Sequence, residues 1–452
     1  MRISLAAVSL ALVLAGCTSV EESPPVVSDS APTSSTVAST TETSAEGGTQ
    51  GEPELLWGVQ FGGLFDDRAA DVALGSDGTV YVVGEVREAV FGEHVGAQTI
   101  TPNLMTGELV PSGDAFIAAY DRDGVLLWSD QFGSAGDDAA WRVALSDAGQ
   151  VVVVGASSGS LGAESSGSLD GFVAVYEPDG RRAWVSQGGG SEVDVFDKVV
   201  VRRDGSVVVA GYSTPDEDEA LLAIEPFLSV HNPGGEAQAF EVEIASGELP
   251  VIHSISGLDD GTVVAMGLTY RGDARAFEVS LEFDGSSVTT EDLPSDFERV
   301  SAAVTLDDLR VVTAGGRREG AGEAALRLHD HDGSLVWSAP FGPDLTTIVD
   351  LMVASSGTFY SSGYGRDVAL SDTHEAVVFA HSPEGNELWR HSFGTSAQDE
   401  LGGFDVLDDC LVAVAGRTGG DLFAENVKDP SVLDDRYDAF VALFASPDPA
   451  CQ

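Results

Sequence analysis

One phrase, clearest at residues 114–155, constrains the fold of this chain more than any other feature. It contains two alternating apolar runs joined by an acidic turn that ends in glycine, then a tryptophan, a Phe-Gly pair and two acids. Two more alternating runs follow. Alternation with a period of two predicts β-strands, and an acid-glycine turn between two such runs predicts a hairpin. Because most of the chain repeats this phrase, we expect an all-β repeat protein.

Two independent counts each indicate seven repeats. Tryptophan recurs at steps of 56 and 52 residues, and the longer interval from Trp184 to Trp337 leaves room for two missing anchors, near Phe240 and Val288. The anchors that are present are Trp57, Trp128, Trp184, Trp337 and Trp389. The hairpin that ends the phrase occurs seven times, at 72–84, 142–155, 198–211, 253–267, 299–315, 348–363 and 403–416.

The hairpin that opens the phrase, at 114–130, is complete in only six repeats. In the seventh, its third strand is read at 437–445, where the chain nearly ends, and its fourth strand at 55–60, where the repeats begin. Four-stranded units placed round an axis leave only short sheet edges. We therefore predict a seven-bladed β-propeller of four-stranded antiparallel blades, closed by an N-terminal strand that completes the last blade.

The repeated pattern reads W-x-x-x-F-G-x-x-x-x-D, then VAL-x-x-D/G-G-x-V-Y-V-x-G, then D-A-F-x-A-x-Y-D-x-D-G-x-x-x-W. The first repeat carries it in Trp57, Phe61, Gly62, Asp67, Gly78, Tyr81, Gly84, Asp114, Phe116, Tyr120, Asp123, Gly124 and Trp128. This pattern resembles the SBBP-type β-propeller repeat over nearly all of 54–445, although repeats three to five depart from it. The resemblance implies a propeller on a secreted or surface protein and implies no reaction.

The first 16 residues read as a secretion signal, with Arg2 followed by an apolar stretch too short to span a bilayer. The residues Leu14-Ala15-Gly16-Cys17 resemble the lipobox of bacterial lipoproteins. This resemblance implies that Cys17 is the lipidated first residue of the mature protein. In that family an aspartate after the cysteine is typical of inner-membrane lipoproteins, so Thr18 at this position makes the resemblance imply the outer membrane.

Residues 17–50 form the next segment. After the cysteine they are rich in Ser, Thr, Pro, Glu and Gly, without an aromatic or basic residue. Such a stretch cannot bury enough apolar surface to fold, so we interpret it as a disordered tether with a reach of roughly 30 Å. Residues 51–452 are expected to form one propeller, held as a monomer in the bacterial envelope.

Acidic residues outnumber basic residues by 74 to 22, which gives a net charge of −52. This charge argues against nucleic acid and against an anionic membrane surface as direct ligands. Two interpretations remain open: a solvated acidic coat, or a surface that binds cations or a basic partner.

Three features carry the site predictions. Cys410 and Cys451 are left after Cys17 and are expected to form a disulfide beside the closure. The paired acids either cap backbone N–H groups or supply oxygen ligands to a hard cation such as Ca²⁺. These acids are Asp66, Asp67, Asp137, Asp138 and Asp399.

The two longest insertions, 85–113 and 417–436, belong to the first and last repeats and should be neighbours on one face. Long loops commonly carry function, so we predict a binding site on this face. The candidate binding residues are Phe91, His94, Met105, Asp67 and Asp138.

No catalytic signature is present: there is no HExxH, CxxC or GxSxG motif, and no glycine-rich phosphate loop. The first hypothesis is a lipid-anchored, non-catalytic module that binds an envelope protein or a glycan, without a cofactor apart from Ca²⁺. The second is a propeller enzyme, such as a glycan lyase, a hydrolase or a quinoprotein. The third is a scaffold lipoprotein that assists outer-membrane assembly.

Overall fold

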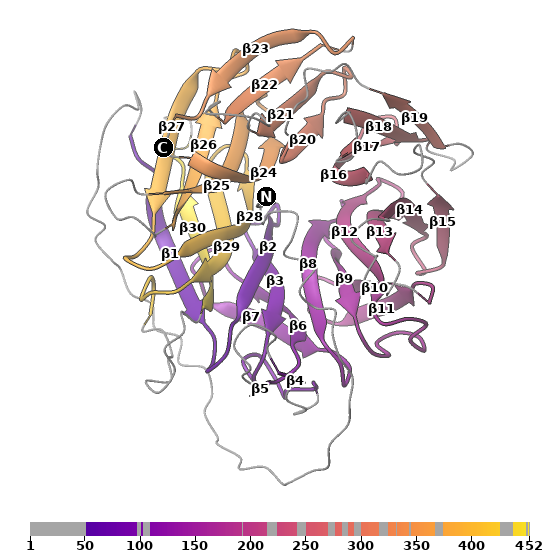
Figure 1. The fold of residues 1–452 in the computed structure, drawn as a ribbon. Helices are drawn as coiled ribbons and strands as arrows, with labels where there is room; N and C mark the ends of the chain where they lie inside the picture. Colours follow the sequence, from indigo (N-terminus) through magenta and orange to yellow (C-terminus); the bar gives the residue numbers. More distant parts are fainter. Residues whose placement is uncertain are drawn as a thin grey trace.

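The computed structural model describes residues 51–96, 101–102, 109–191, 193–214, 224–241, 250–269, 276–282, 288–292, 300–315, 324–330, 332–342, 345–366, 374–424, 437–448 and 451. In these residues the regular elements are β-strands, which form seven four-stranded antiparallel sheets round a common axis (Figure 1). The predicted fold class is confirmed. The signal segment, Cys17 and the tether lie outside the described residues.

Blades 1 to 6 take their strands in chain order from the axis outwards, and the innermost strands of all seven blades contact one another in a closed series. Blade 1 contains β2 (Arg68–Leu74), β3 (Val80–Val86), β6 (Asp114–Tyr120) and β7 (Leu126–Phe132). Blade 2 contains β8 (Asp138–Leu145), β9 (Val151–Ser157), β10 (Asp170–Tyr176) and β11 (Arg182–Gly188). Blade 3 contains β12 (Val193–Val201), β13 (Val207–Thr214), β14 (Glu225–His231) and β15 (Ala237–Glu241).

The remaining blades follow the same order. Blade 4 contains β16 (Pro250–Gly257), β17 (Val263–Thr269), β18 (Ala276–Leu281) and β19 (Val288–Asp292). Blade 5 contains β20 (Ala302–Thr305), β21 (Val311–Gly315), β22 (Ala325–His329) and β23 (Leu335–Pro340). Blade 6 contains β24 (Leu345–Val353), β25 (Phe359–Arg366), β26 (His374–His381) and β27 (Glu387–Phe393). A short pair, β4 (Thr101–Pro102) and β5 (Leu109–Val110), lies in the loop of blade 1.

Blade 7 closes the ring with strands from both ends of the folded chain. It contains β28 (Asp399–Leu407), β29 (Leu411–Thr418), β30 (Asp438–Ala445) and, as its outer strand, β1 (Glu54–Phe61). Strand β1 pairs antiparallel with β30, with Trp57 opposite Leu443 and Phe61 opposite Ala439. The predicted closing strand is therefore confirmed, and blades 7, 1 and 2 are neighbours (Figure 1).

A β-bulge interrupts the innermost strand of six blades at the same place. In β2 the register shifts between Ala69 and Asp71, and Ala69 lies opposite Gly84. A Cβ on Gly84 would lie 1.9 Å from the carbonyl oxygen of Arg68, so only glycine fits there. The other glycines in this position are Gly155, Gly211, Gly267, Gly363 and Gly416.

Within the described residues, a tryptophan on the outer strand of four blades contacts the glycine turn of the next blade. The ring of Trp128 in blade 1 packs on Gly180 of blade 2, whose φ is +86°, and Nε1 of Trp128 donates to the carbonyl of Pro178 at 3.0 Å. The same contact joins Trp184 to Gly235 and Trp337 to Gly385. Each of these turns requires glycine, because the residue has a positive φ and the tryptophan ring leaves no room for a Cβ.

The disulfide between Cys410 and Cys451 is present, with a Cα–Cα distance of 5.2 Å. It joins the turn between β28 and β29 to the segment after β30, and the N–H of Ser446 donates to the carbonyl of Cys410 in the same place. The C-terminal end is thus attached to blade 7 beside the closure. No helix within the described residues is long and apolar enough to cross a membrane.

Candidate binding face

One acid of each predicted pair accepts a hydrogen bond in the loop that leads into an innermost strand. Asp67 accepts a hydrogen bond from the N–H of Gly63 at 2.6 Å, and Asp138 accepts one from the N–H of Ser134 at 2.6 Å. Both carboxylates are buried. Asp399 accepts from the N–H of Thr395 in the same way. Each of these acids therefore caps the backbone N–H four residues before it.

A fourth acid makes the same contact but was missed in the sequence. Asp194 of blade 3 accepts from the N–H of Gly190 at 2.6 Å. Its preceding residue is Val193, so no acidic pair marks it. The spacing of four residues from a loop glycine, serine or threonine to the aspartate is the signal that would have found it.

The first acid of two pairs joins neighbouring blades. Asp137, at the start of blade 2, accepts from the N–H of Gly113 in blade 1 at 2.9 Å. Asp66, at the start of blade 1, accepts from the N–H of Tyr437 in blade 7 at 3.1 Å. The paired acids therefore order the loops on one face of the ring.

Burial shifts the pKa values of the capping acids Asp138 and Asp67. It raises the pKa of Asp138 to about 6 and that of Asp67 well above its ordinary value, although backbone N–H groups oppose this effect. Among the described residues, no group of three or more His, Cys, Asp or Glu side chains could hold a metal ion. Each of the five predicted acids accepts a hydrogen bond from a backbone N–H group, as the capping interpretation expects.

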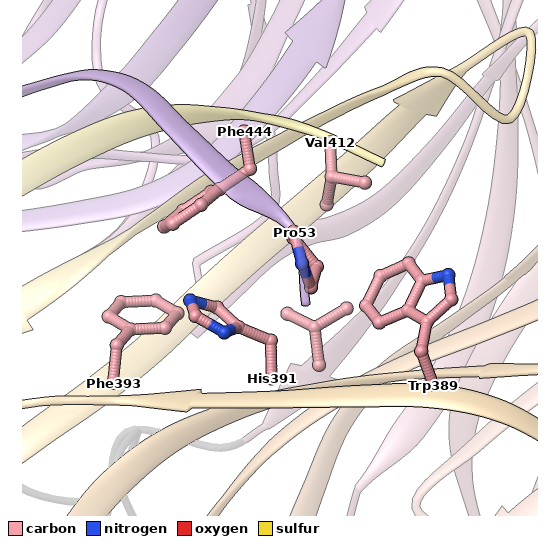
Figure 2. A pocket seen from close by; sticks show the side chains of 7 residues that line it. Pro53, Trp389, His391, Phe393, Val412 and Phe444 are labelled. Atoms are coloured by element: carbon pink, nitrogen blue, oxygen red, sulfur yellow. The ribbon is translucent and has the colours of Figure 1, made fainter. Parts of the chain in front are cut away.

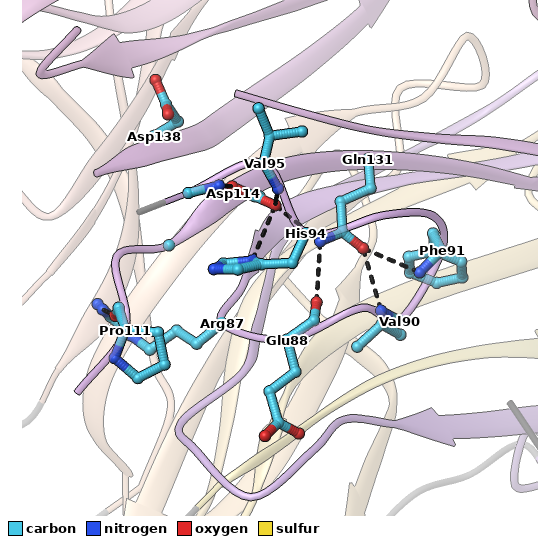
Figure 3. A network of polar contacts seen from close by, with 12 residues as sticks. Arg87, Glu88, Val90, Phe91, His94, Val95, Pro111, Asp114, Gln131 and Asp138 are labelled. Atoms are coloured by element: carbon cyan, nitrogen blue, oxygen red, sulfur yellow. Dashed lines mark hydrogen bonds and ion pairs between the residues drawn. The ribbon is translucent and has the colours of Figure 1, made fainter. Parts of the chain in front are cut away.

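A glutamine on the outer strand clamps the loop of blade 1. The Nε2 group of Gln131 donates to Asp114 and to the carbonyl of Glu88, both at 2.8 Å. Its Oε1 accepts from the N–H groups of Val90 and Phe91, both at 3.0 Å (Figure 3). One side chain therefore satisfies four polar groups and fixes the loop over the end of the blade.

The same glutamine clamp occurs in the two neighbouring blades. Gln60 binds Asp438 and the segment 420–424 in blade 7, and Gln187 binds Asp170 and the segment 159–162 in blade 2. All three glutamines follow the tryptophan in the pattern W-x-x-Q, which the sequence analysis did not single out. In blades 5 and 6 this position holds Pro340 and Ser392.

The predicted binding residue His94 lies against the buried carboxylate of Asp114. The distance from Nδ1 of His94 to Oδ2 of Asp114 is 2.9 Å, and the N–H groups of Val95 and Gly96 each donate to Asp114 at 2.7 Å (Figure 3). Burial opposes ionisation of Asp114, but the hydrogen bonds from His94, Gln131 and Val95 hold its pKa below its ordinary value. Asp114 is thus an ionised anchor for the loop.

Phe91 also packs inward. Its ring contacts Phe61 at 4.9 Å and Phe116 at 5.1 Å between ring centroids, so it joins blade 7 to blade 1. Phe91 and His94 therefore hold the loop in place, and their use in binding stays a prediction. Met105 and residues 425–436 lie outside the described residues.

Charged side chains line the mouth of the axis on the same face. Arg68 on β2 and Glu85 on β3 lie opposite each other, and so do Glu400 on β28 and Arg417 on β29 in the adjacent blade. Arg417 makes an ion pair with Glu400 at 2.6 Å, and Arg87 makes one with Glu85 at 2.6 Å. Sequence alternation cannot show that these positions from different repeats meet at the axis.

A second charged layer lies deeper in the axis, on strands β2, β8, β12 and β24. Lys198 pairs with Asp197 at 2.6 Å, and Arg142 interacts with Asp71, Asp197 and Asp350. Burial raises the pKa of Asp71 to about 7, with Arg142 opposing. Asp71 accepts from the N–H of Val143 in the next blade at 3.0 Å, so it also ties two innermost strands together.

A small cavity of about 10 Å³ lies between blades 6 and 7, lined by Pro53, Val378, Trp389, His391, Phe393, Val412 and Phe444 (Figure 2). A cavity of this size holds one water molecule at most. Because the outer hairpin of blade 7 is split, Pro53 approaches Trp389 where the other blades have a turn. The cavity is a packing feature of the closure.

Known proteins resemble the chain only at low sequence identity. No family model matches it. The regulatory protein FlaEY of Caulobacter vibrioides is 26% identical over 265 residues, which cover 54% of this chain and 26% of that protein. The chain thus spans about a quarter of this relative's length.

Solved structures similar to the chain have low identity. They include the WD40 repeats of RRP9, with a TM-score of 0.48, 8% identity and coverage of 85% of this chain and 96% of that chain. A gluconolactonase from Xanthomonas campestris has a TM-score of 0.37, 11% identity and coverage of 88% and 96%. Puromycin hydrolase has a TM-score of 0.46, 13% identity and coverage of 78% and 50%.

Proposed function

We propose that this protein is a non-catalytic binding module, lipid-anchored in the bacterial envelope, whose partner binds the face carrying loops 85–113 and 417–436. The observation that carries this proposal is the set of three glutamine clamps at Gln60, Gln131 and Gln187. They fix loops of three adjacent blades on one face, whereas the opposite face carries the tight turns. Pre-organised loops lose less entropy when they bind a partner.

A photo-crosslinking amino acid tests which face binds. Placed at the exposed Glu93 in the loop of blade 1, it should give a discrete adduct with one envelope component in living cells. The matched control is the exposed Asp123, in the turn between β6 and β7 on the opposite face. No adduct at Glu93, or the same adduct from both positions, would reject this binding face.

The lipid anchor is a separate part of the proposal and rests on the lipobox resemblance at Cys17. Metabolic labelling with a palmitate analogue should mark the wild-type protein and not the Cys17→Ser variant. Fractionation should then place the labelled protein in the outer membrane. A wild-type protein without label would remove the anchor while leaving the propeller unaffected.

A catalytic alternative draws on the acids of the axis. Perturbed carboxylates grouped in an enclosed site are typical of active sites, and Asp71 and Asp405 have pKa values raised by burial to about 7 and about 6. However, Asp405 accepts from the N–H of Leu74, as Asp71 does from Val143, so both have structural roles. Turnover of a glycan, or quinone absorbance after purification, would favour the enzyme.

A further inference from the structure

We propose that the mouth of the axis binds the carboxylate group of a small monocarboxylate ligand, and that the guanidinium of Arg68 contacts it. This inference rests on the proposed binding function and names the chemistry of one subsite on the same face.

Arg68 is a cation without a fixed partner. It is the first residue of β2, the innermost strand of blade 1, and its side chain is exposed. Within the described residues, its side chain makes no hydrogen bond or ion pair. Its cross-strand neighbour is Glu85, the acid with which it would be expected to pair.

The two nearest carboxylates are already taken by other guanidinium groups. Glu85 pairs with Arg87, which also donates to the carbonyl of Pro111 at 2.7 Å. Glu400 accepts two hydrogen bonds from Arg417, at 2.6 and 3.0 Å. The Arg417 guanidinium also lies 4.4 Å from the ring centroid of Tyr437. These contacts fix both acids away from Arg68.

Asp137 and Asp66, which also lie on this face, are engaged as well. Asp137 accepts from the N–H of Gly113 and lies 3.5 Å from Arg87, and Asp66 accepts from the N–H of Tyr437. Glu85 and Glu400 attract Arg68 electrostatically, but within the described residues none of the four carboxylates makes an ion pair or hydrogen bond with its guanidinium. A ligand anion would complete the charge pattern at this place.

The cations near Arg68 also favour a bound anion at this place. Solvent reaches Arg68, but the surrounding protein removes part of the hydration of its guanidinium. This desolvation, together with repulsion by Arg417 and Arg142, lowers the pKa of Arg68. Arg142, on the innermost strand of blade 2, donates to the carbonyl of Trp141 and is attracted to Asp71, Asp197 and Asp350 deeper in the axis. A bound carboxylate would reduce the repulsion among the three guanidinium groups.

The charge of the whole chain limits the kind of anion. With a net charge of −52, the protein repels polyanions over a long range, so a ligand with a single negative group is favoured. A guanidinium binds a planar carboxylate through two parallel N–H···O bonds. A uronic acid or an acylated amino acid would present such a group at its end.

The test is a titration of the purified protein followed by NMR of the arginine Nε–Hε signals. Sodium glucuronate and N-acetylglycine are the two probes, and glucuronamide and N-acetylglycinamide are their neutral counterparts. We expect at least one acid to shift the Arg68 signal with saturation, and its amide to leave the signal unchanged. Comparison of the two acids distinguishes a sugar source from an amino-acid source.

Variants decide whether Arg68 makes the contact. Arg68→Gln should weaken binding of the acid about 10-fold or more, and Arg68→Lys should weaken it less because the charge is kept. Arg181→Gln, an exposed arginine in the turn between β10 and β11, is the matched control and should bind as the wild type does. Thermal unfolding of each variant confirms that it is folded.

The proposal is overturned if neither acid binds the wild type, if the amides bind equally well, or if Arg68→Gln binds as tightly as Arg181→Gln. These outcomes are distinct from failure of the proposed function, because the crosslinking at Glu93 reads out a macromolecular partner without reference to Arg68. A partner adduct with no carboxylate binding would reject this subsite alone.

Discussion

The indole ring of Trp57 packs on Gly124, which lies in the acid-glycine turn of the neighbouring blade. A Cβ placed on Gly124 would lie 2.8 Å from the ring atom Cγ, and Gly124 has a φ of +80°. The Nε1 group of Trp57 donates to the carbonyl of Arg122 in the same turn at 3.0 Å. Because Trp57 lies on the closing strand, this contact joins blade 7 to blade 1.

The first prediction concerns this glycine. Gly124→Ala should reduce the free energy of unfolding by about 1–3 kcal/mol more than Gly149→Ala, because the new methyl group collides with the indole. Gly149 is the matched control: its φ is +79°, but its Cβ would meet only Pro178, at 3.5 Å. Urea unfolding measures both variants. Equal losses would show that backbone conformation alone requires the glycine.

The second prediction concerns a glutamine clamp. Gln131→Leu removes hydrogen bonds to Val90, Phe91 and Glu88, so hydrogen exchange at the Val90 and Phe91 amides should accelerate by 10-fold or more. Gln150→Leu, on a turn of the opposite face, is the control and should leave these amides protected. Unchanged protection in Gln131→Leu would mean that other contacts fix the loop.

The third prediction concerns the disulfide. Replacing Cys410 and Cys451 together by serine should lower the free energy of unfolding by about 4 kcal/mol, because the bond closes a loop across a separation of 41 residues. Denaturant unfolding of the variant and of the reduced wild type should give similar midpoints. If reduction leaves the midpoint of the wild type unchanged, the bond adds no stability.

The fourth prediction concerns pH. The pKa of Asp138 is raised from 3.8 in the unfolded chain to about 6 in the fold, so the folded state keeps this proton to higher pH. Its contribution to stability is fully present below pH 4 and is lost as the pH rises to about 6, a change of about 3 kcal/mol. Asp138→Asn cannot ionise and keeps an acceptor oxygen for the N–H of Ser134.

Unfolding free energies measured between pH 4 and 6 check this sign. The wild-type protein should lose more stability over this range than Asp138→Asn does. Parallel curves for the two proteins would show that Asp138 titrates alike in the folded and unfolded states.

The sequence predicted the number of blades and their closure because these depend on local, repeated signals. Trp57, the turn glycines and the alternating strands recur in each clear repeat, and hydrophobic alternation is independent of distant residues. The strand starts were less accurate. Strand β28 begins at Asp399 rather than at 403, because the bulge after Leu401 interrupts the alternation on which the prediction depended.

The candidate site depends on contacts between blades, which no single repeat contains. Asp67 and Asp138 lie on the face of the long loops, as the sequence predicted, and their capping role was one of the two interpretations. It did not reveal that Gln131 joins Asp114 to the loop, nor that Glu85 pairs with Arg87 and leaves Arg68 unpaired. These relationships require the three-dimensional neighbours of each side chain.

The pairing of β1 with β30 decides whether the loops of blades 7, 1 and 2 are neighbours, and an engineered disulfide tests it most directly. Val59 lies opposite Val441 in this pairing, and Leu443 is two residues further along β30. Directly opposite Cα atoms are close enough for a disulfide, whereas those offset by two residues are too far apart. Mass spectrometry should find complete oxidation in Val59→Cys/Val441→Cys and almost none in Val59→Cys/Leu443→Cys. Absence of the bond in the first variant, or equal oxidation in both, would contradict the closed ring.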